Sequence, residues 1–426
     1  MKPTLRTATT SLWLILIVAF AMRAGFAVEQ SRKIPHQALR SVPFLYETGD
    51  IAYSVAAGNG FSSPFRQETG PTAWLTPVYP LLVAAMFKIF GTYTFAAFVA
   101  TVVFNILFSA LACVPLFFAA KRIAGLGVAA GAAWLWAVFP NGIIIPFEWI
   151  WDTSLSALLA ATLLWATLAL ADSSRPRNWC AYGLLWGFTL MTNPTFASLF
   201  PFLLAWLAYR AHEQHRQWFS QAALATGIAI LCCVPWTIRN YRVLHAFVPL
   251  RSNLGLELWL GNNDAYRDRW PGWLHPIDSQ AERQKYAAAG EIEYVKEKRQ
   301  EAIQFILNHP RMELHLFRVR FVALWVGSPA PWKDFVETRS LFIRFLFLCN
   351  FLAAVGTLGG LVVLYRRRSQ YLFPVLLFPL LFPCAYYFTR ALLRYRHPID
   401  PIVLLLTALA IAELLQIGVP ADPRRA

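Results

Sequence analysis

Ten long apolar runs are the feature that most constrains how this sequence can fold. Of the 426 residues, 57% are hydrophobic and only 14% are charged, too little charge for an ordinary globular surface. We expect an all-α polytopic membrane protein with about ten transmembrane helices. The runs lie at about 12–28, 94–120, 125–140, 149–171, 179–192, 195–209, 219–237, 341–364, 371–389 and 399–418.

Basic residues between the runs indicate how the chain is oriented. Three clusters occur, at 121–122, 175–177 and 210–216. All three are cytoplasmic if the N-terminus is cytoplasmic and segment 77–91 does not cross the membrane, as the positive-inside rule favours. We therefore interpret the formal charge of +15 as membrane anchoring, since no basic, aromatic-rich soluble module indicates nucleic-acid binding. The six cysteines lie in or beside apolar runs and indicate neither disulfides nor a zinc site.

Arg23 lies near the outer end of the first apolar run. A charge at that depth favours a retained helix over a cleaved signal peptide. Two interpretations stay open for its side chain: it snorkels to the interface, or it faces the bundle and helps to hold the site.

The alternation of apolar and polar regions predicts three parts. Residues 1–237 form an N-terminal transmembrane catalytic module, with a first extracytoplasmic loop at 29–93. Residues 238–340 are polar and predict a small extracytoplasmic domain. Residues 341–426 contain the C-terminal transmembrane helices.

The segment 46–91 predicts two short helices against the membrane. The first covers 50–57, where Asp50 and Tyr53 share one helical face, and Gly58-Asn59-Gly60 ends it. Pro77 opens the second helix, which runs to Gly91. Its length of about 20 Å is short of a bilayer core of about 30 Å, so we expect it to lie in the interface.

Acids and arginines at the outer end of the spans are the candidate site residues. Asp50 is the first candidate, with Tyr53 as a candidate substrate-binding residue beside it. Glu148 and Asp152 lie four residues apart, on one face of a predicted helix, and are either functional or favoured there by the helix dipole. Three guanidinium groups on the same side suit a phosphate, with lipid anchoring as the alternative: Arg239, Arg394 and Arg396.

The chain resembles the integral-membrane glycosyltransferases of the GT-C fold, near the lipid A aminoarabinose transferase and protein O-mannosyltransferase branches. The resemblance rests on an ordered series of segments: GDIAYSVAAGNGFS, TPVYPLLVAAMFKIFG, FEWIWDTSLSALLA, LLWGFTLMTNPT, VPWTIRNY, GLELWLGNND and RYRHPIDP. The acidic pair common at the start of the first loop is represented by the spaced Glu47 and Asp50. Asn193 departs from the basic residue that bacterial relatives often have there.

The resemblance implies a transferase that uses a polyprenyl-phosphate sugar and an envelope glycolipid, glycan or protein as acceptor. Asp50 would be the general base and Asp152 would orient the acceptor or a cation, while Arg239, Arg394 and Arg396 stabilise the leaving phosphate. Glu148 and Tyr53 would contact substrate. No cofactor is implied with certainty, and a divalent cation stays open. The expected location is the inner plasma membrane, with the site facing the periplasm.

A transporter or flippase for a lipid-linked or anionic substrate is the alternative interpretation. Ten spans and intramembrane charges would suit it. Paired repeats with broken helices, which are typical of transporters, are absent from the sequence. A structural or sensory membrane protein is a third alternative.

Overall fold

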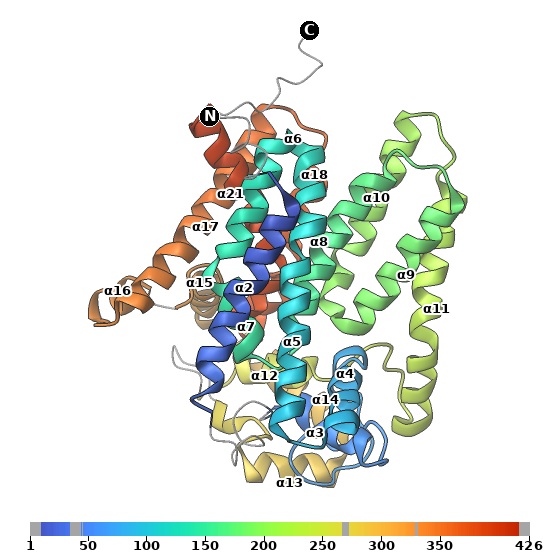
Figure 1. Cartoon of the computed structure of the whole chain (residues 1–426). Helices are drawn as coiled ribbons and strands as arrows, with labels where there is room; N and C mark the ends of the chain where they lie inside the picture. The colour runs from blue at the N-terminus through green and yellow to red at the C-terminus, as the bar shows by residue number, and fades with distance from the viewer. Residues whose placement is uncertain (1–9, 35–43, 45, 266–271, 329–330, 417–426) are drawn as a thin grey trace.

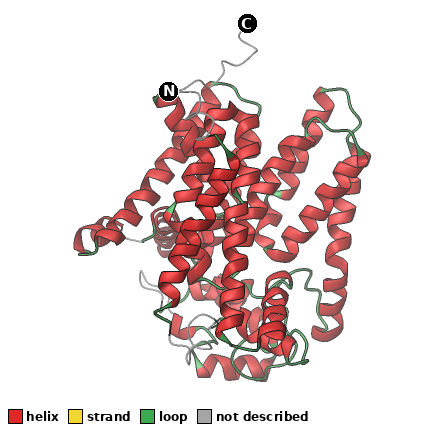
Figure 2. Cartoon of the chain, in the orientation of Figure 1, coloured by secondary structure: helices red, strands yellow, loops and turns green. Residues whose placement is uncertain are grey.

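The computed structural model describes residues 10–34, 44, 46–265, 272–328 and 331–416. Within these ranges the chain forms α-helices and short 3₁₀ turns (Figure 1, Figure 2), and its one bridge of β type joins Ser62 to Pro71. The prediction of an all-α chain is confirmed.

Helices of the bundle follow the predicted apolar runs. Their bounds are α2 (Leu12–Ser31), α5 (Phe95–Leu111), α6 (Cys113–Val138), α8 (Thr153–Leu170), α9 (Pro176–Thr192), α10 (Phe200–Glu213), α11 (Phe219–Leu244), α17 (Leu341–Arg366), α18 (Leu372–Leu381) and α21 (Asp400–Leu414). Gly125, with φ of 84°, interrupts α6 at the point where the predicted runs 94–120 and 125–140 meet.

Six segments of the described chain are long and apolar enough to cross a membrane. They are Leu12–Ser31, Phe95–Val138, Thr153–Leu170, Phe219–Leu244, Leu341–Arg366 and Leu393–Leu414. The chain is thus a multi-pass membrane protein. Helices α9, α10 and α18 have 17, 14 and 10 residues, below a full span, so the count of ten stays a prediction.

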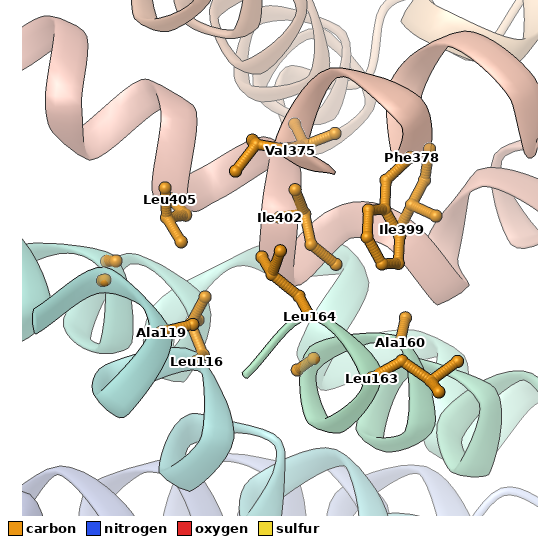
Figure 3. Packing of buried hydrophobic residues seen from close by; sticks show 14 of the residues in the cluster. Leu116, Ala119, Ala160, Leu163, Leu164, Val375, Phe378, Ile399, Ile402 and Leu405 are labelled. Atoms are coloured by element: carbon orange, nitrogen blue, oxygen red, sulfur yellow. The ribbon is translucent and has the colours of Figure 1, made fainter. Parts of the chain in front are cut away.

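The bundle core lies where α6, α8, α18 and α21 meet (Figure 3). Leu116 and Ala119 of α6 pack with Leu163 and Leu164 of α8 and with Ile402 of α21. Many of the buried residues in this core are alanines, which let helix backbones approach closely in a membrane.

Gly360 marks the close contact between α17 and α21. A Cβ added at Gly360 would lie 2.2 Å from the carbonyl oxygen of Leu406. We expect Gly360→Ala to destabilise the protein by about 1–3 kcal/mol, because the two backbones must separate. Thermal unfolding in detergent measures this effect. Gly127→Ala is the control, since nothing lies within 4 Å of its Cβ; an equal drop in Tm in both variants would contradict the packing argument.

Arg23 is fully buried inside the bundle and does not snorkel. Its Nε donates to Ser109 Oγ at 2.8 Å, and its Nη atoms donate to the carbonyls of Ala19, Trp136 and Ala137. The guanidinium therefore joins α2 to α5 and to the end of α6.

The outer helices gather at one end of the bundle (Figure 1). They are α3 (Glu47–Ala56), α4 (Val78–Phe90), α12 (Leu254–Gly261), α13 (Gln280–Ala289) and α14 (Glu291–Asn308). The two helices predicted for segment 46–91 are present as α3 and α4, which pack on each other. The first begins at Glu47, three residues earlier than predicted, and ends at Ala56, just before Gly58 with φ of 90°.

A buried carboxylate ties the first loop to the outer helices. Glu291 accepts hydrogen bonds from the hydroxyls of Thr72, Ser252 and Tyr286 and from the backbone N–H of Ala73. These four donors satisfy the carboxylate in the absence of a salt-bridge partner within 4 Å among the described residues. Glu291 therefore joins the first loop to the start of α14, to α13 and to the segment before α12.

The remaining helices are α7 (Pro140–Glu148), α15 (Pro310–Val326), α16 (Pro331–Glu337), α19 (Cys384–Phe388) and α20 (Leu393–Arg396). α15 packs against α17, α19 and α20. The predicted division at 340 coincides with the start of α17, whereas that at 237 falls inside α11. The three-part division of the chain stays a prediction.

Candidate functional site

A cavity of about 170 Å³ lies between the outer helices and the bundle. It is called the central cavity below. Its walls come from α3, the start of α8, α12 and the α19–α20 region. Both signs of charge line it, with the acids Glu47, Asp152, Glu257 and Asp278 and the bases Arg251, His275, Arg390 and Arg394. Aromatic rings between them are those of Tyr46, Trp151, Tyr386 and Tyr395.

Glu47 is the acid that the first loop contributes to the cavity. It occupies the first turn of α3 and is only 5% exposed. Its Oε1 lies 3.2 Å from Nε2 of His275 and accepts a hydrogen bond from Nε1 of Trp74 at 3.3 Å. Burial alone raises the pKa of Glu47, but the bond from His275 and nearby positive charge outweigh it, so the pKa lies below its ordinary value. Glu47 is therefore ionised.

Asp152 precedes α8 and faces the same cavity. Its Oδ2 accepts hydrogen bonds from Ser156 Oγ at 2.8 Å and Asn193 Nδ2 at 3.0 Å. Burial raises the pKa of Asp152, opposed by these bonds and by the charge of Arg251. Asn193 thus contacts Asp152 at the position where a basic residue is common, and Arg251, from the loop after α11, supplies positive charge nearby.

Arg394 lines the cavity with a guanidinium that is only partly hydrogen-bonded. Its guanidinium carbon lies 4.0 Å from the ring centroid of Trp149 and 5.2 Å from that of Trp151, and Nη2 donates to Tyr395 Oη at 2.9 Å. Among the described residues, Nε and Nη1 have no hydrogen-bond partner, although the side chain is 7% exposed. A buried guanidinium held by aromatic rings, with free donors, is suited to an anionic ligand.

Two neutral polar atoms of the lining are also unsatisfied. Thr153 Oγ1 and Asn253 Oδ1 are buried and lack a hydrogen-bond partner in the described part of the chain. Leaving such atoms unpaired costs about 1–3 kcal/mol each. With Nε and Nη1 of Arg394, they make the lining of the cavity rich in polar atoms without a partner in the described part of the chain.

Asp50 lies one turn further along α3 and does not line the cavity. Its Oδ2 accepts the backbone N–H of Arg66 at 2.9 Å, and Oδ1 accepts from Tyr93 Oη at 3.4 Å. Tyr53 stacks on Tyr93 at 5.6 Å, so Asp50 and Tyr53 do share one face of α3. That face binds the loop around Tyr93.

Glu148 and Asp152 do not share a helical face, and the prediction that they do is wrong. α7 ends at Glu148, Trp149 is extended with φ of −124° and ψ of 105°, and α8 begins only at Thr153. The Trp149 ring stacks on Tyr46 at 5.4 Å, and this packing replaces a continuous helix. Glu148 is exposed outside the central cavity, and partial burial raises its pKa.

Arg396 is hydrogen-bonded inside the bundle. It is fully buried and donates to Asp400 Oδ1 at 2.6 Å, to Asn350 Oδ1 and to the carbonyl of Trp325. It does not line the central cavity. Arg396 thus lies two residues from Arg394 but faces different partners.

Arg239 lies at a second hollow, an apolar groove of about 850 Å³ between α4, α9 and α11. The groove is lined mainly by Val78 and Leu81, Leu184, Phe188 and Met191, and Pro235 and Trp236. The guanidinium of Arg239 donates to the carbonyls of Thr72 and Phe61 and stacks near Trp236 at 5.1 Å. Arg239 therefore holds the first loop against α11 at one end of the groove.

Comparisons with known proteins concern the fold of the chain and its segment 74–238. Residues 74–238 match a family described as dolichyl-phosphate-mannose-protein mannosyltransferase. The match includes Asp152 and Asn193 but excludes Glu47, Asp50 and Arg394. No curated protein sequence matches the chain.

Solved structures show the same overall arrangement. The apo oligosaccharyltransferase of Archaeoglobus fulgidus is similar with a TM-score of 0.56 at 13% identity, covering 97% of this chain and 51% of that one. The same archaeal enzyme, AglB, with an inhibitory peptide and a dolichol-phosphate gives 0.52 at 15% identity, covering 95% and 50%. This chain has the GT-C fold. The expected resemblance to the GT-C glycosyltransferases is confirmed, and the chain spans about half the length of the archaeal enzyme.

One further solved structure is ArnT from Cupriavidus metallidurans bound to undecaprenyl phosphate. Its TM-score is 0.39 at 14% identity, and the alignment covers 97% of this chain and 79% of that one.

Within the GT-C fold, the cavity uses three residues that the sequence did not single out: Glu47, Arg251 and His275. Glu47 was considered only as the partner of Asp50 in a spaced acidic pair. Arg251 and His275 lie in the segment between α11 and α13, more than 200 residues after Glu47, and no local pattern connects them to it. The one signal in the sequence is Glu47 itself, an acid of the first loop three residues before Asp50.

The cavity does not offer a metal-binding set. No group of three or more His, Cys, Asp or Glu side chains is arranged to hold a metal ion in the described part of this GT-C chain. The mechanism proposed for this chain therefore uses its own side chains alone.

Proposed function

We propose that the chain is a membrane glycosyltransferase that moves a sugar from a polyprenyl-phosphate carrier to an envelope glycolipid, glycan or protein. The observation that supports this most is the central cavity. An ionised carboxylate, Glu47, and a guanidinium with free donors, Arg394, line one enclosed space in a GT-C fold. A base and an anion site are the two groups that this reaction needs.

The reaction is a single displacement. The acceptor oxygen or nitrogen attacks the anomeric carbon of the sugar while a carboxylate removes its proton. The bond from the anomeric carbon to the phosphate oxygen breaks, and the lipid phosphate leaves with the electron pair. One displacement inverts the anomeric centre. Glu47 is the base that the geometry favours. Asp50 is the base expected from the sequence, and the variant Asp50→Asn is compared with Glu47→Gln.

Charge on the leaving phosphate would be stabilised by Arg394. Its planar fork can donate two hydrogen bonds to one phosphate, and it cannot lose its proton at physiological pH. The apolar groove between α4, α9 and α11 suits the polyprenyl chain, and the archaeal relative binds a dolichol-phosphate. Arg239, at the end of that groove, is the second candidate for the phosphate.

The remaining predicted site residues receive supporting roles in this proposal. Asp152, with its raised pKa, orients an acceptor group through hydrogen bonds. Arg396 positions Arg394 by anchoring α20 to the bundle. Tyr53 and Glu148 lie outside the cavity and would contact only the parts of a substrate that extend beyond it.

We propose the inner plasma membrane as the location, with the cavity facing the periplasm. The basic segments 175–177 and 210–216 support this orientation. They lie at the start of α9 and at the end of α10 with the turn that follows it, at the end of the bundle opposite α3 and α13 (Figure 1).

Mass analysis of envelope glycolipids and glycoproteins tests the proposed function. Deleting the gene is expected to remove one sugar mass from a defined acceptor, and the wild-type gene, but not Glu47→Gln, restores it. Restoration by Glu47→Gln would remove Glu47 from the mechanism, and restoration by Glu47→Gln and Asp50→Asn alike would favour a transporter, because transport needs no base. Repeating the transfer with purified protein and EDTA tests for a divalent cation.

A further inference from the structure

We infer that His275 is a positioning residue that the outer domain contributes to the base Glu47. This inference rests on the proposed function, because it assumes that Glu47 removes the acceptor proton. His275 Nε2 lies 3.2 Å from Glu47 Oε1, and both side chains are buried. The contact joins α3 of the first loop to a turn more than 220 residues later in the chain.

The turn that contains His275 determines which ring nitrogen carries the proton. The backbone N–H of Ile277 donates to Nδ1 at 3.2 Å, so Nδ1 is an acceptor. The proton of the neutral ring therefore lies on Nε2, which is the atom that faces Glu47. The His275 carbonyl also accepts from Asp278 N–H at 2.9 Å and Ser279 N–H at 2.8 Å. The backbone thus prepares the imidazole as a donor to the carboxylate.

Aromatic rings hold the imidazole in this orientation. Phe65 meets it edge to face at 5.7 Å and Trp74 at 6.5 Å between ring centroids. Trp74 also donates its indole N–H to the same Oε1 of Glu47. Oε1 is therefore held by two donors, and Oε2 is the oxygen left to accept a proton.

The hydrogen bond from His275 lowers the pKa of Glu47. Burial raises the pKa of Glu47, and it is opposed by His275 from the outer domain, by a backbone N–H bond of Glu47 itself and by the charge of Arg394 from α20. Asp152, the residue before α8, lines the same cavity with a charge of the same sign. Without His275, burial is opposed less and the pKa of Glu47 rises. A larger fraction of the carboxyl is then protonated and unable to act as a base.

Two substitutions at one position test the role. His275→Phe keeps the ring packing against Phe65 and Trp74 but removes the donor. We expect kcat to fall by about 10- to 100-fold, because the variant loses a hydrogen bond to a charged group. The KM for the lipid-linked sugar should change little. The acid limb of the kcat–pH profile should move to higher pH. His275→Gln, whose amide can donate to Glu47, should recover part of kcat and return the limb toward lower pH.

The control and the contrary outcomes separate this inference from the proposed function. His309→Phe, at an exposed histidine of the same domain, should leave kcat and the acid limb of the kcat–pH profile unchanged. If the wild type transfers sugar and His275→Phe shows the same kcat and pH profile, the inference is overturned while the proposed function stands. Equal losses in the Phe and Gln variants, with an unshifted acid limb, would assign His275 a purely structural role. If the wild type transfers no sugar, the proposed function itself fails.

Discussion

Glu47→Gln is expected to lower the rate of sugar transfer by about 10²- to 10⁴-fold, the usual contribution of a general base. Glutamine has the same shape and can still accept the bonds from His275 and Trp74 through its carbonyl oxygen, so the fold should be retained. It cannot take the acceptor proton. Binding of undecaprenyl phosphate, measured by native mass spectrometry, should stay within a few fold of the wild type.

Asp50→Asn is the matched control on the same helix. The asparagine oxygen can still accept the backbone N–H of Arg66, which donates to Asp50 in the wild type. Because Asp50 does not line the central cavity, transfer by this variant should remain within a few fold of the wild type. The reverse ranking, with Asp50→Asn inactive and Glu47→Gln active, would make Asp50 the base and remove Glu47 from the mechanism.

The sequence predicted the two short helices of the first loop, but it misplaced the start of the first one. Gly49, just before the predicted start, lies inside the helix and is required by its packing: a Cβ there would lie 2.4 Å from the carbonyl oxygen of Phe44. The helix consequently begins at Glu47, about 4.5 Å along the axis before Asp50. That difference decides which carboxylate lines the cavity.

Long-range packing explains the other differences between prediction and structure. The four-residue spacing of Glu148 and Asp152 predicted one helical face, but the stacking of Trp149 on Tyr46 and its contact with Arg394 interrupt the helix between them. Arg394 and Arg396 looked equivalent because they are two residues apart. Only the bundle, through Asp400 and Asn350, shows that Arg396 is already satisfied. Apolar runs specify helices, whereas the partners of a buried charge depend on tertiary contacts.

Arg394→Lys is expected to weaken the binding of undecaprenyl phosphate by about 10- to 100-fold, although the positive charge is kept. Lysine cannot stack as a plane on Trp149 or donate a paired set of hydrogen bonds to one phosphate. Affinity for undecaprenol, which has the same chain without phosphate, should change little. The difference between the two ligands isolates the phosphate contribution from that of the apolar groove.

Arg239→Lys distinguishes the two candidate phosphate sites. The guanidinium of Arg239 is already bound to the carbonyls of Phe61 and Thr72, so its replacement should lower the Tm more than the affinity for undecaprenyl phosphate. A loss of phosphate-dependent binding in Arg239→Lys, with Arg394→Lys unaffected, would move the phosphate to the end of the groove beside α11. The anomeric carbon would then lie outside the central cavity, and Glu47 could not act on an acceptor attacking it.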